Sequence, residues 1–189
     1  MKHVSILALN DAVSASVADP TIMFTGVNDL LVSSGKPPAF KVQLVGLTKT
    51  VKLHNGPFTV HSDILLADLK KTDLIIITAL GGDIRDAIKK NAAYIPWISK
   101  RYKKGADVAS LCIGAFLLAS TGLLNGKECS THWLWANVFR EMFPEVTLVD
   151  GRVVTEQNGL YSSGGATSYW SLLLHLVEKY AGREMAITA

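Results

Sequence analysis

Cys112 stands where a sequence pattern can place a nucleophile. It directly follows a short apolar run, residues 107–111, and Gly114 stands where a new helical pattern begins. A strand that ends at a nucleophilic side chain and turns at once into a helix is typical of a nucleophile elbow. Such a turn lies at the carboxyl edge of a sheet, beside a helix N-terminus whose partial positive charge favours the thiolate. We therefore expect a backbone φ at Cys112 that is positive or otherwise unusual, and a reactive thiol with a lowered pKa.

The local sequence leaves a second interpretation of Cys112 open. Free cysteines are usually small buried hydrophobes, and this one could simply pack between a strand and a helix. In the functional interpretation, backbone N–H groups of the turn, including that of Ile113, stabilise an oxyanion or hold a ligand. Cys129 has no glycine turn and is expected in the core. The two cysteines form no disulfide framework or zinc motif, and we expect no metal and no cofactor.

His132 is the candidate partner of the thiol. A histidine within hydrogen-bond reach of a cysteine can take its proton, although a lone histidine is more often structural. Gly81 and Gly82 follow an apolar strand and form a turn whose backbone N–H groups could face a ligand, or a tight turn only. Asp11 and Ser16 follow the first strand and complete the candidate ligand-binding residues.

Alternating strand and helix patterns must position these residues. Short apolar runs and helical periodicity follow one another along the whole chain, which is typical of βα units. We predict a flavodoxin-like three-layer α/β sandwich with a mostly parallel central sheet, and a small hairpin at 51–53 and 58–61. The predicted strands are residues 4–9, 41–47, 73–78, 107–111, 146–149, 152–155 and 159–162; the predicted helices are residues 20–31, 83–104, 113–121, 133–143 and 167–180.

Composition narrows the class of protein. The chain has 189 residues, 49% of them hydrophobic and 19% charged, which fits one globular domain over residues 1–189. A net charge of +3 is too small to argue nucleic-acid binding by this segment. The first apolar run ends at Asn10 and is too short for a signal peptide or a membrane span. We expect a cytoplasmic protein with no membrane contact.

One segment resembles a known family. After the helix that follows Cys112, the chain reads LLNGKECSTHW over residues 123–133. This is similar to the ThiJ/PfpI superfamily of amidotransferase-like domains, whose members have a cysteine elbow and then a strand running into Thr-Thr-His. Cys112 and His132 match the cysteine and the histidine. The resemblance implies the same α/β fold and a site at the elbow.

The resemblance is strongest to one branch, the N-terminal domains of AraC-type transcription regulators. Residues 115–133, 143–146 and 155–184 carry it, including the motif SSGGAT at 162–167. In that branch a pair of helix-turn-helix motifs follows the region of Gly182, Arg183 and Glu184. This chain stops at Ala189, so we expect that region to be absent and any contact with DNA to require it.

The acids of catalytic members have no match here. Related hydratases and regulators often have Asp-x-Ala-Gly-Pro-x-Glu at the first helix, and Ser16 and Ile22 stand at the two acidic positions. Asp19 stands at the glycine and is interpreted as a helix N-cap before Pro20. Asp11 or Asp19 could still compensate. Glu156 and Gln157 could also approach, but solvation at the surface explains them more simply.

Three functions follow as hypotheses. The first is a ligand-sensing and dimerising domain of an AraC-family regulator, with an unidentified small-molecule ligand, a homodimer and little catalysis. The second is a free-standing hydrolase, hydratase or glyoxalase with Cys112 as nucleophile and His132 as base. The third, compatible with the first, is a redox sensor in which Cys112 is reversibly oxidised.

Overall fold

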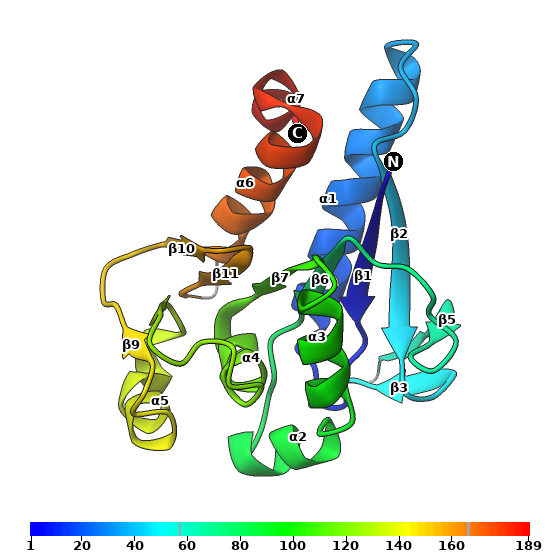
Figure 1. The fold of residues 1–189 in the computed structure, drawn as a ribbon. Coiled ribbons are helices and arrows are strands. Elements are labelled where there is room, and N and C mark those ends of the chain that lie inside the picture. The colour runs from blue at the N-terminus through cyan, green and yellow to red at the C-terminus, as the bar shows by residue number, and fades with distance from the viewer. Residues whose placement is uncertain (57, 166) are drawn as a thin grey trace.

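The computed structural model of the chain describes residues 1–56, 58–165 and 167–189. The strands of its central sheet are Lys2–Leu7 (β1), Phe40–Gly46 (β2), Ile64–Leu65 (β5), Leu74–Ile77 (β6), Asp107–Ser110 (β7), Val154–Gln157 (β10) and Leu160–Ser163 (β11). Their order is β10-β11-β7-β6-β1-β2-β5, and all neighbours are parallel except β10 and β11. Helices cover both faces of the sheet, which confirms the predicted three-layer α/β sandwich (Figure 1).

The centre of the sheet is apolar on both faces. All four residues of β6 are buried, with Ile75 and Ile77 in one hydrophobic cluster and Leu74 and Ile76 in the other. A strand buried on both sides is what a parallel sheet between two helix layers requires, and it explains the continuous apolar run at this point. The predicted strand over 73–78 is therefore confirmed.

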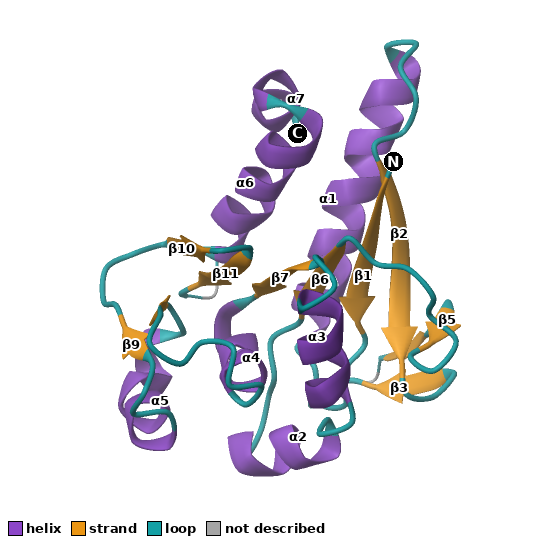
Figure 2. Ribbon diagram, in the orientation of Figure 1, coloured by secondary structure: helices purple, strands orange, loops and turns teal. Residues whose placement is uncertain are grey.

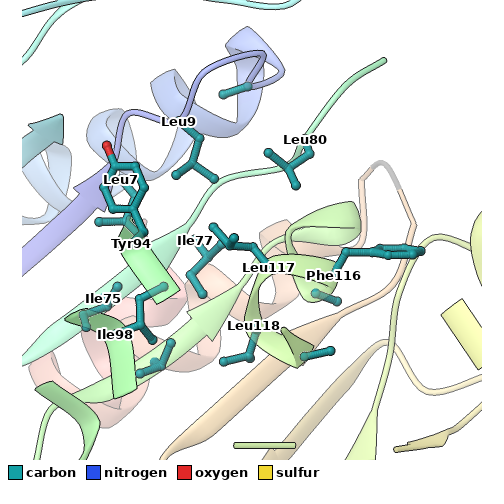
Figure 3. Close-up of a cluster of buried hydrophobic side chains, with 14 of the residues drawn as sticks. Leu7, Leu9, Ile75, Ile77, Leu80, Tyr94, Ile98, Phe116, Leu117 and Leu118 are labelled. Carbon is teal, nitrogen blue, oxygen red and sulfur yellow. The ribbon is translucent and has the colours of Figure 1, made fainter. Parts of the chain in front are cut away.

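Two helix layers cover the sheet (Figure 2). The first layer is Ser14–Ser33 (α1), Tyr169–Ala181 (α6) and Arg183–Thr188 (α7); the second is Ile84–Lys90 (α2), Tyr94–Tyr102 (α3), Ala115–Ala119 (α4) and Ala136–Met142 (α5). Each layer packs on its own buried cluster. Figure 3 shows the core beneath the second layer, where Tyr94, Ile98 and Phe116 to Leu118 pack against Ile75 and Ile77.

The first helix begins earlier than predicted. α1 starts at Ser14, its N-cap residue is Val13, and Pro20 lies inside the helix. The N-cap interpretation of Asp19 is therefore wrong. Pro20 lacks an N–H and cannot bond the carbonyl of Ser16, so the helix accepts one missing hydrogen bond in its second turn. The apolar face of residues such as Val17, Phe24 and Val27 buries enough surface to hold the helix across that gap.

The single helix predicted over 83–104 is two helices, α2 and α3. Asn91, at the end of α2, is fully buried. Its side chain accepts from the Asn10 N–H at 2.9 Å and donates to the carbonyls of Asn10 at 2.9 Å and Ala87 at 2.8 Å. These bonds hold the loop after β1 against the end of α2. The helix ends there because the Asn91 side chain is hydrogen-bonded to the backbone of Asn10.

Two predicted strand features lie outside the central sheet. The hairpin is confirmed as Thr50–Lys52 (β3) and Thr59–His61 (β4), which pair antiparallel in a sheet of their own. The strand predicted over 146–149 is Thr147–Leu148 (β9), which pairs parallel with Glu128–Cys129 (β8) in another two-stranded sheet. The segment that contains His132 therefore follows a strand of this small sheet, which lies beside β10 and β11.

Two predicted helices begin with a 3-10 turn. The turn Cys112–Gly114 (η1) precedes α4, and the turn Trp133–Trp135 (η2) precedes α5. One residue separates β7 from the first turn, and three residues separate β8 from the second, so the chain changes direction over a short stretch in both places. Among the described residues, no helix combines the length and the apolar composition needed to cross a bilayer.

Candidate functional site

Cys112 lies on a strained turn at the end of a central strand. Its φ is +52°, a left-handed value that non-glycine residues rarely adopt, and it begins η1 right after β7. A Cβ added at Gly114 would lie 2.7 Å from the carbonyl oxygen of Thr78 and 2.8 Å from that of Ile77. Glycine is therefore needed for the new helix to pack on β6, and the predicted unusual φ of Cys112 is confirmed.

The electrostatic setting of the thiol differs from the expectation. Only 5% of Cys112 is exposed. Burial raises the pKa of the Cys112 thiol to about 11, while the hydrogen bond from the Ile113 N–H acts in the opposite direction. Loss of hydration therefore outweighs the stabilisation of a thiolate at this turn. The expected lowering of the Cys112 pKa is therefore wrong, and the role of the Ile113 N–H toward an oxyanion or a ligand stays a prediction.

The segment of His132 reaches the elbow, but the imidazole bonds elsewhere. The Thr131 hydroxyl donates to the Cys112 carbonyl at 3.3 Å. The His132 ring stacks on Trp133 with centroids 5.8 Å apart, and its Nδ1 accepts from the Leu134 N–H at 3.2 Å. In the part of the chain that the structure describes, no hydrogen bond joins His132 to the thiol. A role for His132 as base stays a prediction.

Ser16 comes to the elbow region and is used for structure. Its hydroxyl accepts from the Ala79 N–H at 2.9 Å and donates to the Val13 carbonyl at 2.7 Å. The residue is 1% exposed. Ser16 thus ties the start of α1 to the loop after β6. With both sides of the hydroxyl engaged, it offers little capacity to a ligand in this state.

Asp11 and Gly81 also bond to each other. Asp11 has a φ of +62°, and its carbonyl accepts from the Gly81 N–H at 2.9 Å. Its carboxylate pairs with Lys90 at 2.8 Å. The predicted donor at Gly81 is therefore already occupied. The structure brings Asp11, Gly81 and Ser16 together where β1 and β6 end, the point at which the strand order reverses and ligands of open α/β sheets usually bind.

His54, from the loop after β3, was not expected at this edge. A Cβ at Gly81 would lie 2.3 Å from the His54 ring, and one at Gly82 would lie 3.2 Å from it. Gly82 also has a φ of +73°. The two glycines therefore make room for the imidazole. No sequence signal pointed to His54, because the contact depends on where the hairpin folds back.

Asp19 and Tyr169 form a second unexpected pair. The Tyr169 hydroxyl donates to Asp19 Oδ2 at 2.5 Å, joining α1 to the first residue of α6. The pKa of the Tyr169 phenol is raised by burial, then by Asp19, and further by the proximity of Cys112. Tyr169 is thus a neutral phenol that donates to Asp19. The available signal was Asp19 itself, a charged residue at a position where the family pattern has glycine.

Glu156 and Gln157 bond away from the elbow. Glu156 accepts from the Tyr161 hydroxyl at 2.9 Å and bonds His175 at 2.8 Å, on the side of β10 that faces α6. The Gln157 side chain accepts from the Glu128 N–H at 3.1 Å. Neither residue supplies the missing acid. Ala166 of the SSGGAT motif lies outside the described residues.

A cleft of about 390 Å³ opens beside the elbow. Ser130 and Thr131 line it from one side, and Gly164 and Ser168 from the other, with Trp133 at the rim. Since Thr131 touches the Cys112 carbonyl, the cleft and the elbow share a wall. Two ion pairs border it, Arg152 with Glu128 at 2.5 Å and Asp150 with Arg140 at 2.7 Å. Within the described ranges, no cluster of three or more metal-ligating side chains occurs.

A mostly parallel α/β sandwich with a cysteine on a positive-φ turn after a central strand defines a class of cysteine-elbow proteins. Comparison with known families shows which family of that class the chain belongs to. The chain belongs to the DJ-1/PfpI family, because residues 25–179 match the sequence pattern of that family.

Curated relatives include transcription regulators and an enzyme. The HTH-type transcriptional regulator CdhR of Pseudomonas aeruginosa is 27% identical over 135 residues, which are 71% of this chain and 39% of CdhR. The isonitrile hydratase of Pseudomonas putida is 27% identical over 166 residues, which are 86% of this chain and 68% of the hydratase. This chain therefore spans about two fifths of the length of the regulator.

Solved structures agree on the fold. A solved protein structure from Vibrio parahaemolyticus superposes with a TM-score of 0.86 at 23% identity, over 99% of this chain and 96% of that one. An AraC family transcriptional regulator from Pseudomonas putida gives a TM-score of 0.75 at 20% identity. At such identities the likeness concerns the fold.

Proposed function

We propose that this chain is the ligand-sensing and dimerising domain of an AraC-family transcription regulator and that it has little catalytic activity. The observation that carries the proposal is an elbow cysteine whose surroundings lack the acids of catalytic members. Relatives that are transcription regulators support it, as does the family membership of the chain.

The two acid positions illustrate the difference from a catalytic site. Ile22 is 63% exposed on the outer side of α1, and Ser16 is committed to Ala79 and Val13. Proton transfer by a positioned group is typically worth about 100-fold to 10,000-fold in rate. A thiol whose pKa is about 11, without a carboxylate at either position, is poorly suited to turnover near neutral pH.

The cleft beside the elbow is the binding site in this proposal. It joins a concave surface to hydroxyl groups of Ser130 and Ser168 and to an aromatic rim at Trp133, the combination of apolar wall and few polar groups that small-molecule sites usually have. Binding there would be transmitted through Thr131 to the elbow. Contact with DNA would be made by a helix-turn-helix region that follows the segment described here.

A cysteine-dependent hydratase is the second candidate function. Two observations favour it: the strained φ of Cys112, which structures usually retain only at functional sites, and the isonitrile hydratase that aligns with 86% of this chain. In this alternative, Asp19 through Tyr169 would have to replace the missing acid. Reversible oxidation of Cys112 is compatible with either function.

One set of measurements separates these functions. The chain is assayed with methylglyoxal, an isonitrile and amide substrates, beside Cys112→Ser, and screened for stabilising metabolites by thermal unfolding. We expect turnover below about 1% of a typical kcat of about 10 per second, and a ligand whose stabilising effect is lost when Trp133→Ala alters the cleft. Cys112-dependent turnover at ordinary rates would overturn the sensor proposal. Light scattering should show a dimer at micromolar concentration, and a monomer would contradict the dimerising role.

A further inference from the structure

A group of basic side chains gathers at the amino edge of the central sheet. Two of them stand in the loop that enters β6, and the others stand at the end of α3 and in the turn that enters β7. Cys112 follows the opposite end of β7, so this group and the candidate site lie at opposite edges of the sheet. We call the group the amino-edge patch, and its members are Lys70, Lys71, Lys100, Arg101, Lys103 and Lys104.

Arg101 joins the two segments of the patch. β6 and β7 are parallel neighbours, so the loops that enter them reach the same edge of the sheet. The Arg101 guanidinium donates to the carbonyl of Lys70 at 2.7 Å and to the carbonyl of Leu69. It also lies 5.4 Å from the centroid of the Trp97 ring. Since these contacts hold Arg101 in place, the charges that the patch offers to a partner are mainly those of its lysines.

The patch concentrates the positive charge of the chain. Residues 67–73 and 100–106 contain six basic residues and two acids, Asp68 and Asp73, so they carry a net charge of +4, while the whole chain carries +3. The five lysines of the patch are exposed. Of the ion pairs in the described ranges, only that of Lys71 with Asp73, at 3.8 Å, belongs to the patch. The small net charge of the chain therefore hides a local excess at one edge.

The patch has no apolar centre. Among the described residues, none of the exposed large hydrophobic side chains lies in 67–73 or 100–106. A protein–protein interface usually has an apolar core from which lysine is depleted. The phosphate groups of a nucleic acid require only positive charge and N–H donors, and lysine is a common phosphate ligand. The composition of the patch therefore fits a phosphate backbone better than the surface of another protein.

We infer that the amino-edge patch contacts the phosphate backbone of duplex DNA without regard to sequence, beside the contact that the helix-turn-helix region of the proposed function makes. The inference goes beyond that function, because it gives this domain a DNA contact of its own. Each of the four lysines without an ion pair would neutralise about one phosphate and release its counterion. Because the patch lies opposite the elbow, DNA held there would not cover the cleft.

The test is the salt dependence of DNA binding by the chain. A fluorescent duplex of about 30 base pairs with an arbitrary sequence is titrated with the protein, and its anisotropy is measured between about 20 and about 200 mM salt. We expect a Kd of about 10⁻⁴ M or tighter near about 50 mM salt. The logarithm of the binding constant should fall against the logarithm of the salt concentration with a slope between about −3 and −4, because each phosphate contact contributes about −0.9.

Two charge-matched variants locate the contact. The patch variant replaces by glutamine the four lysines without an ion pair, Lys70, Lys100, Lys103 and Lys104. It should weaken binding at least about tenfold near about 50 mM salt and reduce the slope to about −1 or less, whereas arginine at the same four positions should preserve both values. The control variant replaces by glutamine four exposed basic residues on the hairpin, α2 and α7, namely Lys49, Lys52, Lys89 and Arg183. It should change the Kd less than about threefold, since its charges lie away from the bound phosphates.

Several results would overturn the inference. They are a Kd weaker than about 1 mM near about 20 mM salt, a slope that the patch variant leaves unchanged, a control variant that loses as much affinity as the patch variant, and an arginine variant that loses binding. A glutamate polymer that binds at least as tightly as the duplex at the same salt would also overturn it, because the patch would then fit an acidic protein.

The proposed function fails separately from this inference. If the chain binds DNA through the patch but the metabolite screen finds no ligand, the DNA contact stands and the sensor proposal falls. If the screen finds a ligand but the chain does not bind the duplex, the sensor proposal stands and the DNA contact falls.

Discussion

The thiol of Cys112 should be far less reactive at neutral pH than a free cysteine. Burial raises its pKa from 9.0 to about 11, a difference of about two units. Two units correspond to about a hundredfold less thiolate at any pH well below 9, or about 2.7 kcal/mol. Because the thiolate is the nucleophile, alkylation should slow by about the same factor, and limited access to a side chain that is 5% exposed should slow it further.

The assay is alkylation by iodoacetamide, followed by mass spectrometry, in a Cys129→Ser background. Iodoacetamide is neutral, so charged side chains do not bias its approach to the thiol. The rate should rise about tenfold per pH unit up to about pH 10 with no plateau. A midpoint at or below 9.0, the ordinary value for the thiol, would refute the reasoning, since it would show that the helix N-terminus outweighs burial after all.

The same shift has a consequence for stability. A group whose folded-state pKa is raised holds its proton more tightly when folded, so the unfolded chain loses protons first as the pH rises. The unfolding free energy should therefore fall between about pH 9 and pH 11. Tyrosines titrate in the same pH range, so the quantity to measure is the difference in unfolding free energy between the unmodified chain and Cys112→Ser. An identical dependence on pH for both proteins would contradict the prediction.

Three further predictions concern the framework of the site. Gly114→Ala should destabilise the fold by about 2 kcal/mol in urea unfolding, because the added Cβ meets the Thr78 and Ile77 carbonyls; an unchanged midpoint would contradict the close approach. Asn91→Ala should cost about 2 kcal/mol by the same measurement, since the partly buried Asn10 N–H loses its acceptor, and Asn91→Asp should recover part of this; equal losses would refute the role of the acceptor. Burial raises the pKa of Glu156, but hydrogen bonds from Tyr161 and His175 outweigh burial and lower the pKa below its ordinary value of 4.5. The stability that Glu156 contributes should therefore be lost as the pH falls below 4.5. Glu156→Gln should reduce the dependence of the unfolding free energy on pH in this range, and an unchanged dependence would count against the prediction.

The fold could be predicted because its signals are local and repeated. The run of buried residues in β6 reads as a strand covered on both faces, and Gly114 after Cys112 reads as a turn into a helix. Both patterns depend on residues that are neighbours in sequence. The positive φ of Cys112 followed from the same local pattern and is confirmed.

Predicted helix boundaries were wrong where they depend on contacts with distant segments of the chain. The break at Asn91 depends on Asn10, and the early start of α1 depends on a helix that tolerates Pro20 for the sake of its packed face. Neither contact is visible from the periodicity of one segment. Proline was interpreted as a helix start because that is its commonest position, and tertiary packing overrode that preference.

The sequence predicted where the candidate site lies in the fold better than it predicted the pKa of its thiol. Cys112, Ser16 and Gly81 do gather at the carboxyl edge of the sheet, because parallel strands bring their loops to one side. The pKa of Cys112 depends on how deeply the finished fold buries the turn, which no local motif reports. The pair of Asp19 and Tyr169 spans the chain almost from end to end, so only the folded structure brings it into view.

The edges of the central sheet limit how two copies can associate. One edge is β5, whose two residues pair only with Val45 and Gly46, so the rest of β2, which carries the exposed Lys41, also lies at this edge. The other edge is β10, a four-residue strand that carries Glu156 and whose last residue, Gln157, accepts from the Glu128 N–H. Short or charged edge strands discourage the addition of a strand from another chain. A dimer of this domain would therefore form through the side chains of helices and loops, and its interface would be tuned by single substitutions more readily than a shared backbone ladder could be.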